Sequence, residues 1–270
     1  MSDDFILMCA PNGARKMKDD HPELPIGADD LADCAESIVD MGASLIHVHV
    51  RDPRGRHSLD TDEYRRVSGA IKDRVGEKLI VQVTTEACGI YSRYEQMAMV
   101  RDLKPEAISV AVREICPDAA AEAEAAKFYR WLSRENVMAQ HILYSPEDVQ
   151  RFERLRARDV ICESKPFVLF VLGRYTSDLT GDVSELTRFI EAASAETIWA
   201  VCCFGVTEHE AVTMASGSGG HARVGFENNL TMPDGSIAKD NAALVANAAE
   251  IGLEARRKIA SADDLRQLLR

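Results

Sequence analysis

The sequence predicts a closed parallel (β/α)8 barrel, a TIM barrel, and three observations lead to this prediction. Short β-branched or apolar runs alternate with helix-patterned segments about every 30 residues, and eight such strand–helix units can be counted. No linker or low-complexity tract interrupts the 270 residues, and their 46% hydrophobic content is sufficient for a packed core. We therefore expect a single domain over residues 1–270 with a short helical extension at its C-terminus. An open doubly wound sheet remains the alternative.

The expected strands are short runs rich in β-branched and other apolar residues. They cover residues 5–10, 45–50, 79–84, 107–112, 137–143, 166–172, 197–204 and 221–227. Since these runs are apolar over most of their length, both faces of the sheet should be covered, as in a parallel barrel.

The segments between these runs have helical periodicity. In the first of them, apolar residues recur at helical spacing from Leu31 to Met41, and Gly42 follows as a stop signal. Pro146 after Ser145 is a typical helix start, and Thr207 begins another helix. The expected helices cover residues 29–41, 62–75, 93–103, 119–134, 146–156, 184–195, 207–216 and 241–251, with the extension at 261–270.

Composition excludes several classes of protein. The net charge of −12, without a basic cluster, argues against a nucleic-acid or anionic-membrane surface. No apolar run is long enough for a membrane helix, and the N-terminal residues lack targeting features, so we expect a cytoplasmic protein. Seven irregularly spaced cysteines without a C-x-x-C pair indicate reduced thiols rather than disulfides or a cysteine metal site.

Two histidines on one expected strand are the first candidate for chemistry. His47 and His49 should point to the same face of the strand, because successive side chains alternate between faces. Their Cα atoms would lie roughly 6.5–7 Å apart, so that both rings can reach one metal ion. The alternative is a pair of polar core residues satisfied by hydrogen bonds.

The last expected strand offers a third ligand. Arg223, Gly225 and Glu227 share the face that should point into the barrel, and functional residues of such barrels lie at the C-terminal strand ends. Glu227 is therefore a candidate ligand, although it could instead cap a helix or form an ion pair. Two histidines and one carboxylate suit a catalytic zinc ion, or Fe(II) or another divalent metal, acting as a Lewis acid.

The glycine-rich segment at residues 216–220 resembles a phosphate-binding loop. It precedes the last expected strand and therefore lies at the N-terminal face of the barrel, away from the site. We interpret it as a structural turn.

Several motifs together resemble the β-keto acid cleavage enzymes, a family of zinc-dependent (β/α)8 proteins. The resemblance covers nearly the whole chain and is carried by His47-x-His49-x-Arg51-Asp52, Asn12-Gly13, His21-Pro22-x-Leu24-Pro25, Thr84-Thr85, Pro105-Glu106 with Ser109, and Arg223-Val224-Gly225-Phe226-Glu227-Asn228-Asn229. It implies conversion of a β-keto acid and acetyl-CoA to acetoacetate and a new acyl-CoA, by a homo-oligomer that is usually a tetramer.

The resemblance also implies roles for individual residues. Zinc would be bound by His47, His49 and Glu227, and Arg223 would help to generate the substrate carbanion. The expected substrate-binding residues are Thr84, Thr85, Ser109, Gln140, Ala14 and Arg15, and the expected catalytic residues are Arg223, Asn228 and Glu114.

The chain departs from the family pattern at three positions. Many members have an acid where this chain has Asn228, which cannot act as a base. Either Asn228 only orients a water or the substrate, or another acid such as Glu86 or Glu114 takes the proton. Gln140 and Ala14 stand where other members carry a glutamate. These changes remove negative charge, and they predict a neutral or anionic β-keto acid rather than an aminated one.

Two other functions remain open. A CoA-independent metal-dependent aldolase or isomerase would use the same Lewis-acid chemistry. A catalytically silent metal-binding barrel is the second alternative, because Asn228 could mark a lost base.

Four arginines are candidate partners for CoA phosphates, only because they lie at the expected mouth of the barrel. They are Arg15, Arg51, Arg113 and Arg174.

Overall fold

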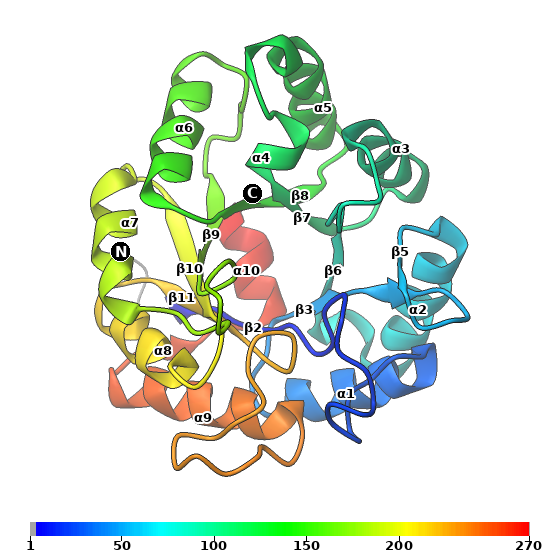
Figure 1. Cartoon of the computed structure of the whole chain (residues 1–270), viewed down its shortest axis with the longest axis vertical. Helices are drawn as coiled ribbons and strands as arrows, with labels where there is room; N and C mark the ends of the chain where they lie inside the picture. The colour runs from blue at the N-terminus through cyan, green and yellow to red at the C-terminus, as the bar shows by residue number, and fades with distance from the viewer. Residues whose placement is uncertain (1–3, 270) are drawn as a thin grey trace.

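The computed structural model describes residues 4–269 and forms a closed barrel of eight parallel strands (Figure 1). The strands follow one another around the barrel in chain order, and the last pairs with the first, which confirms the predicted (β/α)8 fold over an open sheet. They are β2 (Leu7–Cys9), β3 (Leu45–Val48), β6 (Ile80–Thr84), β7 (Ala107–Ala111), β8 (Met138–Leu143), β9 (Phe167–Leu172), β10 (Ile198–Cys203) and β11 (His221–Val224).

Eight helices surround the barrel at the expected places: α1 (Ala28–Asp40), α2 (Thr61–Val75), α3 (Arg93–Leu103), α5 (Glu122–Arg134), α6 (Pro146–Ala157), α7 (Leu186–Ala192), α8 (Glu208–Gly217) and α9 (Asn241–Glu254). Ser145 caps α6 through its side chain and Pro146 occupies the first turn, as predicted. Thr207 precedes α8 but does not cap it, because its hydroxyl donates to the Gly181 carbonyl at 2.8 Å. None of these helices, and none elsewhere in residues 4–269, is long and apolar enough to cross a membrane.

Short elements that were not predicted as separate units join this framework. They are β1 (Asp4–Phe5) paired with β12 (Lys258–Ile259), the hairpin of β4 (Val50–Arg51) and β5 (His57–Ser58), α4 (Val112–Ile115), and the 3-10 turns η1 (Gly76–Lys78), η2 (Ala119–Ala121) and η3 (Val183–Glu185). The expected C-terminal helix is α10 (Ala262–Leu269), and residue 270 lies outside the described residues.

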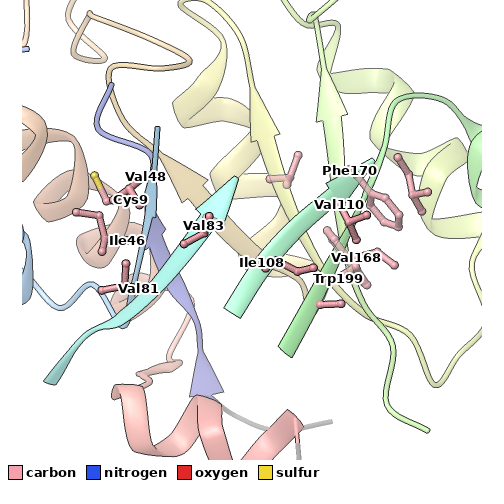
Figure 2. Packing of buried hydrophobic residues seen from close by; sticks show 14 of the residues in the cluster. Cys9, Ile46, Val48, Val81, Val83, Ile108, Val110, Val168, Phe170 and Trp199 are labelled. Carbon is pink, nitrogen blue, oxygen red and sulfur yellow. The ribbon is translucent and has the colours of Figure 1, made fainter. Parts of the chain in front are cut away.

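Side-chain alternation along the strands divides the core into two layers. Figure 2 shows part of the outer layer, where side chains such as Ile46, Val48, Val81 and Val83 belong to the cluster that includes the surrounding helices. The inner layer contains the residues of opposite parity, and Leu265 of α10 packs in the same cluster. Its apolar members include Ile6, Leu45, Ile80, Ala107 and Phe167, all near the N-terminal ends of the strands. Polar inner residues such as His47 and Thr84 lie further along their strands, toward the C-terminal mouth.

All eight barrel strands are shorter than predicted, and two of them end two or three residues early at the mouth. The second barrel strand, β3, ends at Val48, because the chain then leaves to form the β4–β5 hairpin, and His49 lies at this break. The last strand, β11, ends at Val224, because Gly225 adopts a φ of +130° and starts a turn. Both ends lie at the mouth of the barrel.

Candidate metal centre and active site

His47, His49 and Glu227 converge at the mouth of the barrel. The Nε2 atoms of the two histidines are 3.1 Å apart, and Glu227 Oε2 lies 3.7 Å from the first and 3.6 Å from the second. Both rings are buried, with 1% of each residue exposed. The expectation that two same-face histidines and Glu227 meet is thus realised in space, although Glu227 reaches the histidines from a turn rather than from a strand.

This triangle fits the ligand set of a zinc ion. Ligand atoms about 2.0–2.2 Å from a tetrahedral zinc are about 3.4 Å apart, close to the three observed distances. Glu227 Oε2 is buried without a hydrogen-bond partner among residues 4–269, which is costly for a carboxylate unless a cation is bound. These three residues also form a candidate metal-binding group by their ligand atoms, all within 4.8 Å of one another.

The turn that carries Glu227 is fixed by its neighbours. The Glu227 amide donates to the Ala10 carbonyl at 3.0 Å, and Asn241 Oδ1 accepts from the Phe226 amide at 2.9 Å. Gly225 allows this path, since a Cβ there would lie 2.5 Å from the Ala10 carbonyl oxygen. The turn therefore ties the loop after β11 to the end of β2.

Gly13 is the second glycine that this geometry requires. Its φ is +60°, and a Cβ would lie 2.6 Å from Glu227 Cγ. We expect Gly13→Ala to displace the Glu227 side chain and to weaken metal binding by about 10-fold or more, with a smaller effect on folding. Metal affinity from chelator competition checks this result, and Gly69→Ala, in an open position on α2, is the control. Wild-type affinity in Gly13→Ala would contradict the role of this contact.

The charges at the site favour neutral histidines and an ionised Glu227. Burial lowers the pKa of His47 to about 4, so that the ring is neutral and its nitrogen lone pair is free near pH 7. Burial alone would raise the pKa of Glu227, but the neighbouring positive charges, of which Arg223 contributes most, together outweigh burial, and the pKa is lowered. Arg223 Nη2 lies 3.4 Å from Glu227 Oε1 and 3.3 Å from Cys202 Sγ. Its Nε has no partner among the described residues and can donate to a ligand.

A small cavity adjoins these residues. It measures about 20 Å³ and is lined by His47, His49, Thr84, Glu86, Ile142, Tyr144, Val171, Arg174, Phe204, Arg223 and Glu227. This volume holds about one water molecule, so a larger ligand fits only if side chains at the mouth move. A larger cavity, about 490 Å³, lies by the N-terminal ends of β8 and β9 and beside α10, at the face of the barrel opposite to the one where barrel enzymes have their active sites.

Glu86 connects the cavity to two arginines at its mouth. Its Oε1 lies 3.5 Å from Arg15 Nη1 and 3.4 Å from Arg174 Nη2, and its Oε2 lies 4.0 Å from His49 Nδ1. The carboxylate therefore lies between the histidine and the two arginines. Arg15 is exposed over 59% of its side chain, whereas Arg174 is exposed over 18%.

The other expected substrate residues lie at varying depth. Thr84 lines the cavity, and its hydroxyl accepts from the Glu86 amide at 3.1 Å. The Thr85 hydroxyl donates to the Ser109 carbonyl at 3.0 Å, and Ser109 pairs in register with Thr84. Gln140 contacts Gln82, as described below, and is not among the cavity-lining residues, and neither is half-buried Ala14.

The two other expected catalytic residues do not line the cavity either. Asn228 is buried, and neither its Oδ1 nor its Nδ2 has a partner within residues 4–269. Glu114 accepts from the Ala87 amide at 3.1 Å, and burial raises its pKa to about 7. Its carboxylate thus lies behind the segment that carries Glu86.

Two of the arginines considered for CoA phosphates have other contacts. Arg51 is buried and donates to carbonyls of the loop after β2, including Gly13 and Lys16, so it holds this loop against the β4–β5 hairpin. Arg113 is paired with Asp148, and its guanidinium lies 4.5 Å from the centre of the Tyr144 ring. Arg15 and Arg174 remain at the mouth.

Sequence reasoning assigned no role to several residues of the site. Gln82 contacts His47, and Asn12 holds the His49 backbone by accepting from its amide at 3.3 Å and donating to its carbonyl at 2.9 Å. Lys16 Nζ donates to the Glu227 carbonyl at 2.8 Å. Strand parity could have identified Gln82, which has the same inward parity as Thr84, whereas Asn12 and Lys16 lie on an irregular loop that no periodicity predicts.

Glu208 is a buried carboxyl beneath the turn that carries Glu227. It is 3% exposed, accepts from Asn229 Nδ2 at 3.3 Å, and has its pKa raised to about 8 by burial. The folded state therefore retains a proton that the unfolded chain releases near pH 4.3, so this group reduces stability as pH rises toward about 8.

We expect Glu208→Gln to remove this effect. Relative to wild type, the free energy of unfolding of the variant should rise between pH 5 and pH 8, by about 1.4 kcal/mol for each pH unit at most. Urea unfolding at several pH values measures the difference in free energy of unfolding between variant and wild type. The contributions of the other titrating groups are the same in both proteins and cancel in this difference. A difference that does not vary with pH would contradict a protonated Glu208 in the folded state.

The fold and the site together define a class of protein. A closed (β/α)8 barrel carries its buried histidines, a carboxylate and an arginine at the C-terminal mouth, the location of the active site in barrel enzymes. The family model of the β-keto acid cleavage enzymes matches residues 4–270. The chain belongs to this family, which confirms the resemblance seen in the sequence.

Individual relatives agree with this assignment. The chain is 28% identical to the 3-keto-5-aminohexanoate cleavage enzyme of Fusobacterium nucleatum, over 100% of this chain and 98% of that protein. It is 25% identical to the 3-oxoadipate:acetyl-CoA acetyltransferase of Cupriavidus necator, over 100% and 95% of the two chains. The apo structure of ObcA superimposes with a TM-score of 0.72 at 17% identity, over 92% of this chain and 65% of that one, which supports the barrel fold alone.

Proposed function

We propose that the protein is a metal-dependent acyltransferase that converts a β-keto acid and acetyl-CoA to acetoacetate and a new acyl-CoA. The observation that carries the proposal is the triangle of His47, His49 and Glu227 beside Arg223 at the mouth of the barrel. Family membership supports the cleavage of a β-keto acid. The acetyl-CoA acetyltransferase among the relatives supports the co-substrate.

Zinc is the ion that this donor set suits best, and Fe(II) would accept the same ligands. A bound ion would supply positive charge that polarises the substrate carbonyl and stabilises an adjacent carbanion. The buried lone pairs of the two neutral histidines and of Glu227 Oε2 are the groups that would hold it.

The protein residues would then organise two acyl transfers. Arg223 would bind the substrate carboxylate through donors that Glu227 and Cys202 leave free. The α-carbon, after losing a proton, attacks the acetyl thioester, forms a C–C bond and releases the CoA thiolate. That thiolate attacks the original keto carbon, the bond from this carbon to the α-carbon breaks, and the acetoacetate carbanion regains the proton. The products are acetoacetate and the new acyl-CoA.

Glu86 is our choice for the group that takes and returns the proton. It lines the cavity, whereas Glu114 does not, and Asn228 has no basic atom. Arg15 and Arg174 hold the Glu86 carboxylate at the mouth. A negatively charged substrate could bind these arginines in place of Glu86. Glu114, with a pKa of about 7, is the second candidate because its value suits proton transfer.

The substrate is proposed to be a neutral or anionic β-keto acid. Arg174 and Arg223 line the cavity, and its only lining carboxylates among the described residues are the candidate ligand Glu227 and Glu86. An amine would therefore lack a carboxylate partner other than Glu86. We also propose that the protein acts in the cytoplasm as a homotetramer.

A panel of β-keto acids, each assayed with and without acetyl-CoA, tests this function. We expect acetoacetate only in the presence of acetyl-CoA, with neutral or dicarboxylic members turned over faster than 3-keto-5-aminohexanoate. Cleavage without CoA would indicate an aldolase or isomerase instead. Metal binding with no turnover of any member would indicate a silent binding protein.

A further inference from the structure

A chain of side-chain amides crosses the barrel behind the candidate metal site. Gln82 Oε1 lies 2.8 Å from His47 Nδ1, Gln82 Nε2 donates to Gln140 Oε1 at 3.1 Å, and Gln140 Nε2 donates to Met8 Sδ at 3.5 Å. Both glutamines are 1% exposed. The chain thus links β3, β6, β8 and β2 in a layer that solvent does not reach.

We propose that Gln82 is a positioning residue that fixes the tautomer and the orientation of His47 for metal binding, and that Gln140 fixes Gln82. The proposal deepens the proposed function and rests on the metal site that it contains. In this proposal Gln140 contacts Gln82, in place of the substrate contact that the sequence analysis expected for it.

The direction of the hydrogen bonds carries the argument. Because Gln82 Nε2 donates to Gln140, the Gln82 atom that faces His47 is an oxygen, which can only accept. His47 Nδ1 must then carry the proton, and the lone pair is left on Nε2, the atom that points at His49 and Glu227. The amide chain therefore selects the tautomer that a metal requires.

The partner of His47 is a neutral amide, although metal-bound histidines often donate to a carboxylate. A carboxylate would make the imidazole a stronger donor and would reduce the positive charge of the metal centre. An amide holds the ring without this effect, so that the centre remains a stronger Lewis acid. His49 is held differently, because Asn12 binds its backbone on both sides and its Nδ1 has no hydrogen-bond partner within the described chain.

Two substitutions at one position separate geometry from charge. Gln82→Met keeps the length of the side chain but removes the acceptor, and it should weaken zinc binding by about 10–100-fold. Gln82→Glu keeps an acceptor, to which the Gln140 amide can donate after rotating, so zinc affinity should stay within about 3-fold of wild type or rise. Its kcat should nevertheless fall by about 10-fold or more, with a smaller change in KM.

Zinc affinity is measured on the full-length metal-loaded protein by competition with a chromogenic chelator, and thermal unfolding reports on the fold. Gln96→Met is the matched control, because Gln96 is equally buried but lies on α3, outside the barrel, and should leave zinc affinity unchanged. Gln140→Met should weaken zinc binding less than Gln82→Met does.

The outcomes distinguish this inference from the proposed function. If wild type binds zinc and Gln82→Met binds it equally well, the positioning role of Gln82 is wrong, whatever the activity. Equal losses of affinity in Gln82→Met and Gln82→Glu would also overturn it, because the acceptor would then be irrelevant. If wild type itself binds no metal, it is the proposed function that fails.

Discussion

His49→Ala is expected to lose both metal and activity. His49 Nε2 lies 3.1 Å from His47 Nε2 and 3.6 Å from Glu227 Oε2, and the substitution removes it from the three candidate ligands. The two ligands that remain do not hold a catalytic zinc tightly. Zinc content should fall from about one ion per chain to well below it, and acetoacetate formation should fall at least about 10³-fold. Metal analysis and a rate assay on the same preparation give both values.

The fold should survive this change. His49 lies at the break between β3 and β4, where Asn12 holds its backbone, and the Ala variant keeps both of these backbone hydrogen bonds. His209→Ala, on the surrounding helix α8, is the control and should retain metal and turnover. Full zinc content in His49→Ala would show that the ion, if any, is bound elsewhere.

Arg223→Gln separates catalysis from metal binding. The three candidate ligands remain. Removal of the guanidinium takes away the positive charge that faces Glu227, and a bound metal ion would compensate for that loss. Metal content should therefore stay near that of wild type. Because the donors facing the developing negative charge are lost, kcat should fall by about 10²–10³-fold.

Steady-state kinetics together with metal analysis test Arg223→Gln. The metal-free variant should also be less stable than metal-free wild type, since the Glu227 carboxylate then has neither the Arg223 guanidinium nor a metal ion beside it. An unchanged kcat would mean that Arg223 serves only to balance the charge of Glu227, the structural alternative to a catalytic role.

The barrel and the convergence of the three candidate ligands follow from the sequence for simple physical reasons. Alternation along β3 places Ile46 and Val48 outward and His47 inward, and the C-terminal ends of parallel strands meet at one mouth. Strand order and parity therefore place His47 and the ends of β3 and β11 at one mouth, whereas the positions of His49 and Glu227 also depend on the backbone that follows these strands.

The remainder of the site depends on irregular backbone, which has no period. The prediction of a strand through Glu227 was wrong because Gly225 turns the chain after Val224. Likewise, Arg51 was considered as a phosphate partner, but its guanidinium is occupied by carbonyls of a loop. Such contacts form only when distant segments are packed together, so the sequence offered no signal for them.

The origin of the carbon atoms in acetoacetate tests the central proposal most directly. With acetyl-CoA carrying ¹³C in both acetyl carbons and an unlabelled β-keto acid from the panel, the account predicts label at C3 and C4 of acetoacetate, in the carbonyl and methyl groups. C1 and C2 should come unlabelled from the substrate, and the new acyl-CoA should carry no ¹³C. Acetoacetate without label, or cleavage products formed without any acetyl transfer, would contradict acyl transfer from acetyl-CoA by this protein.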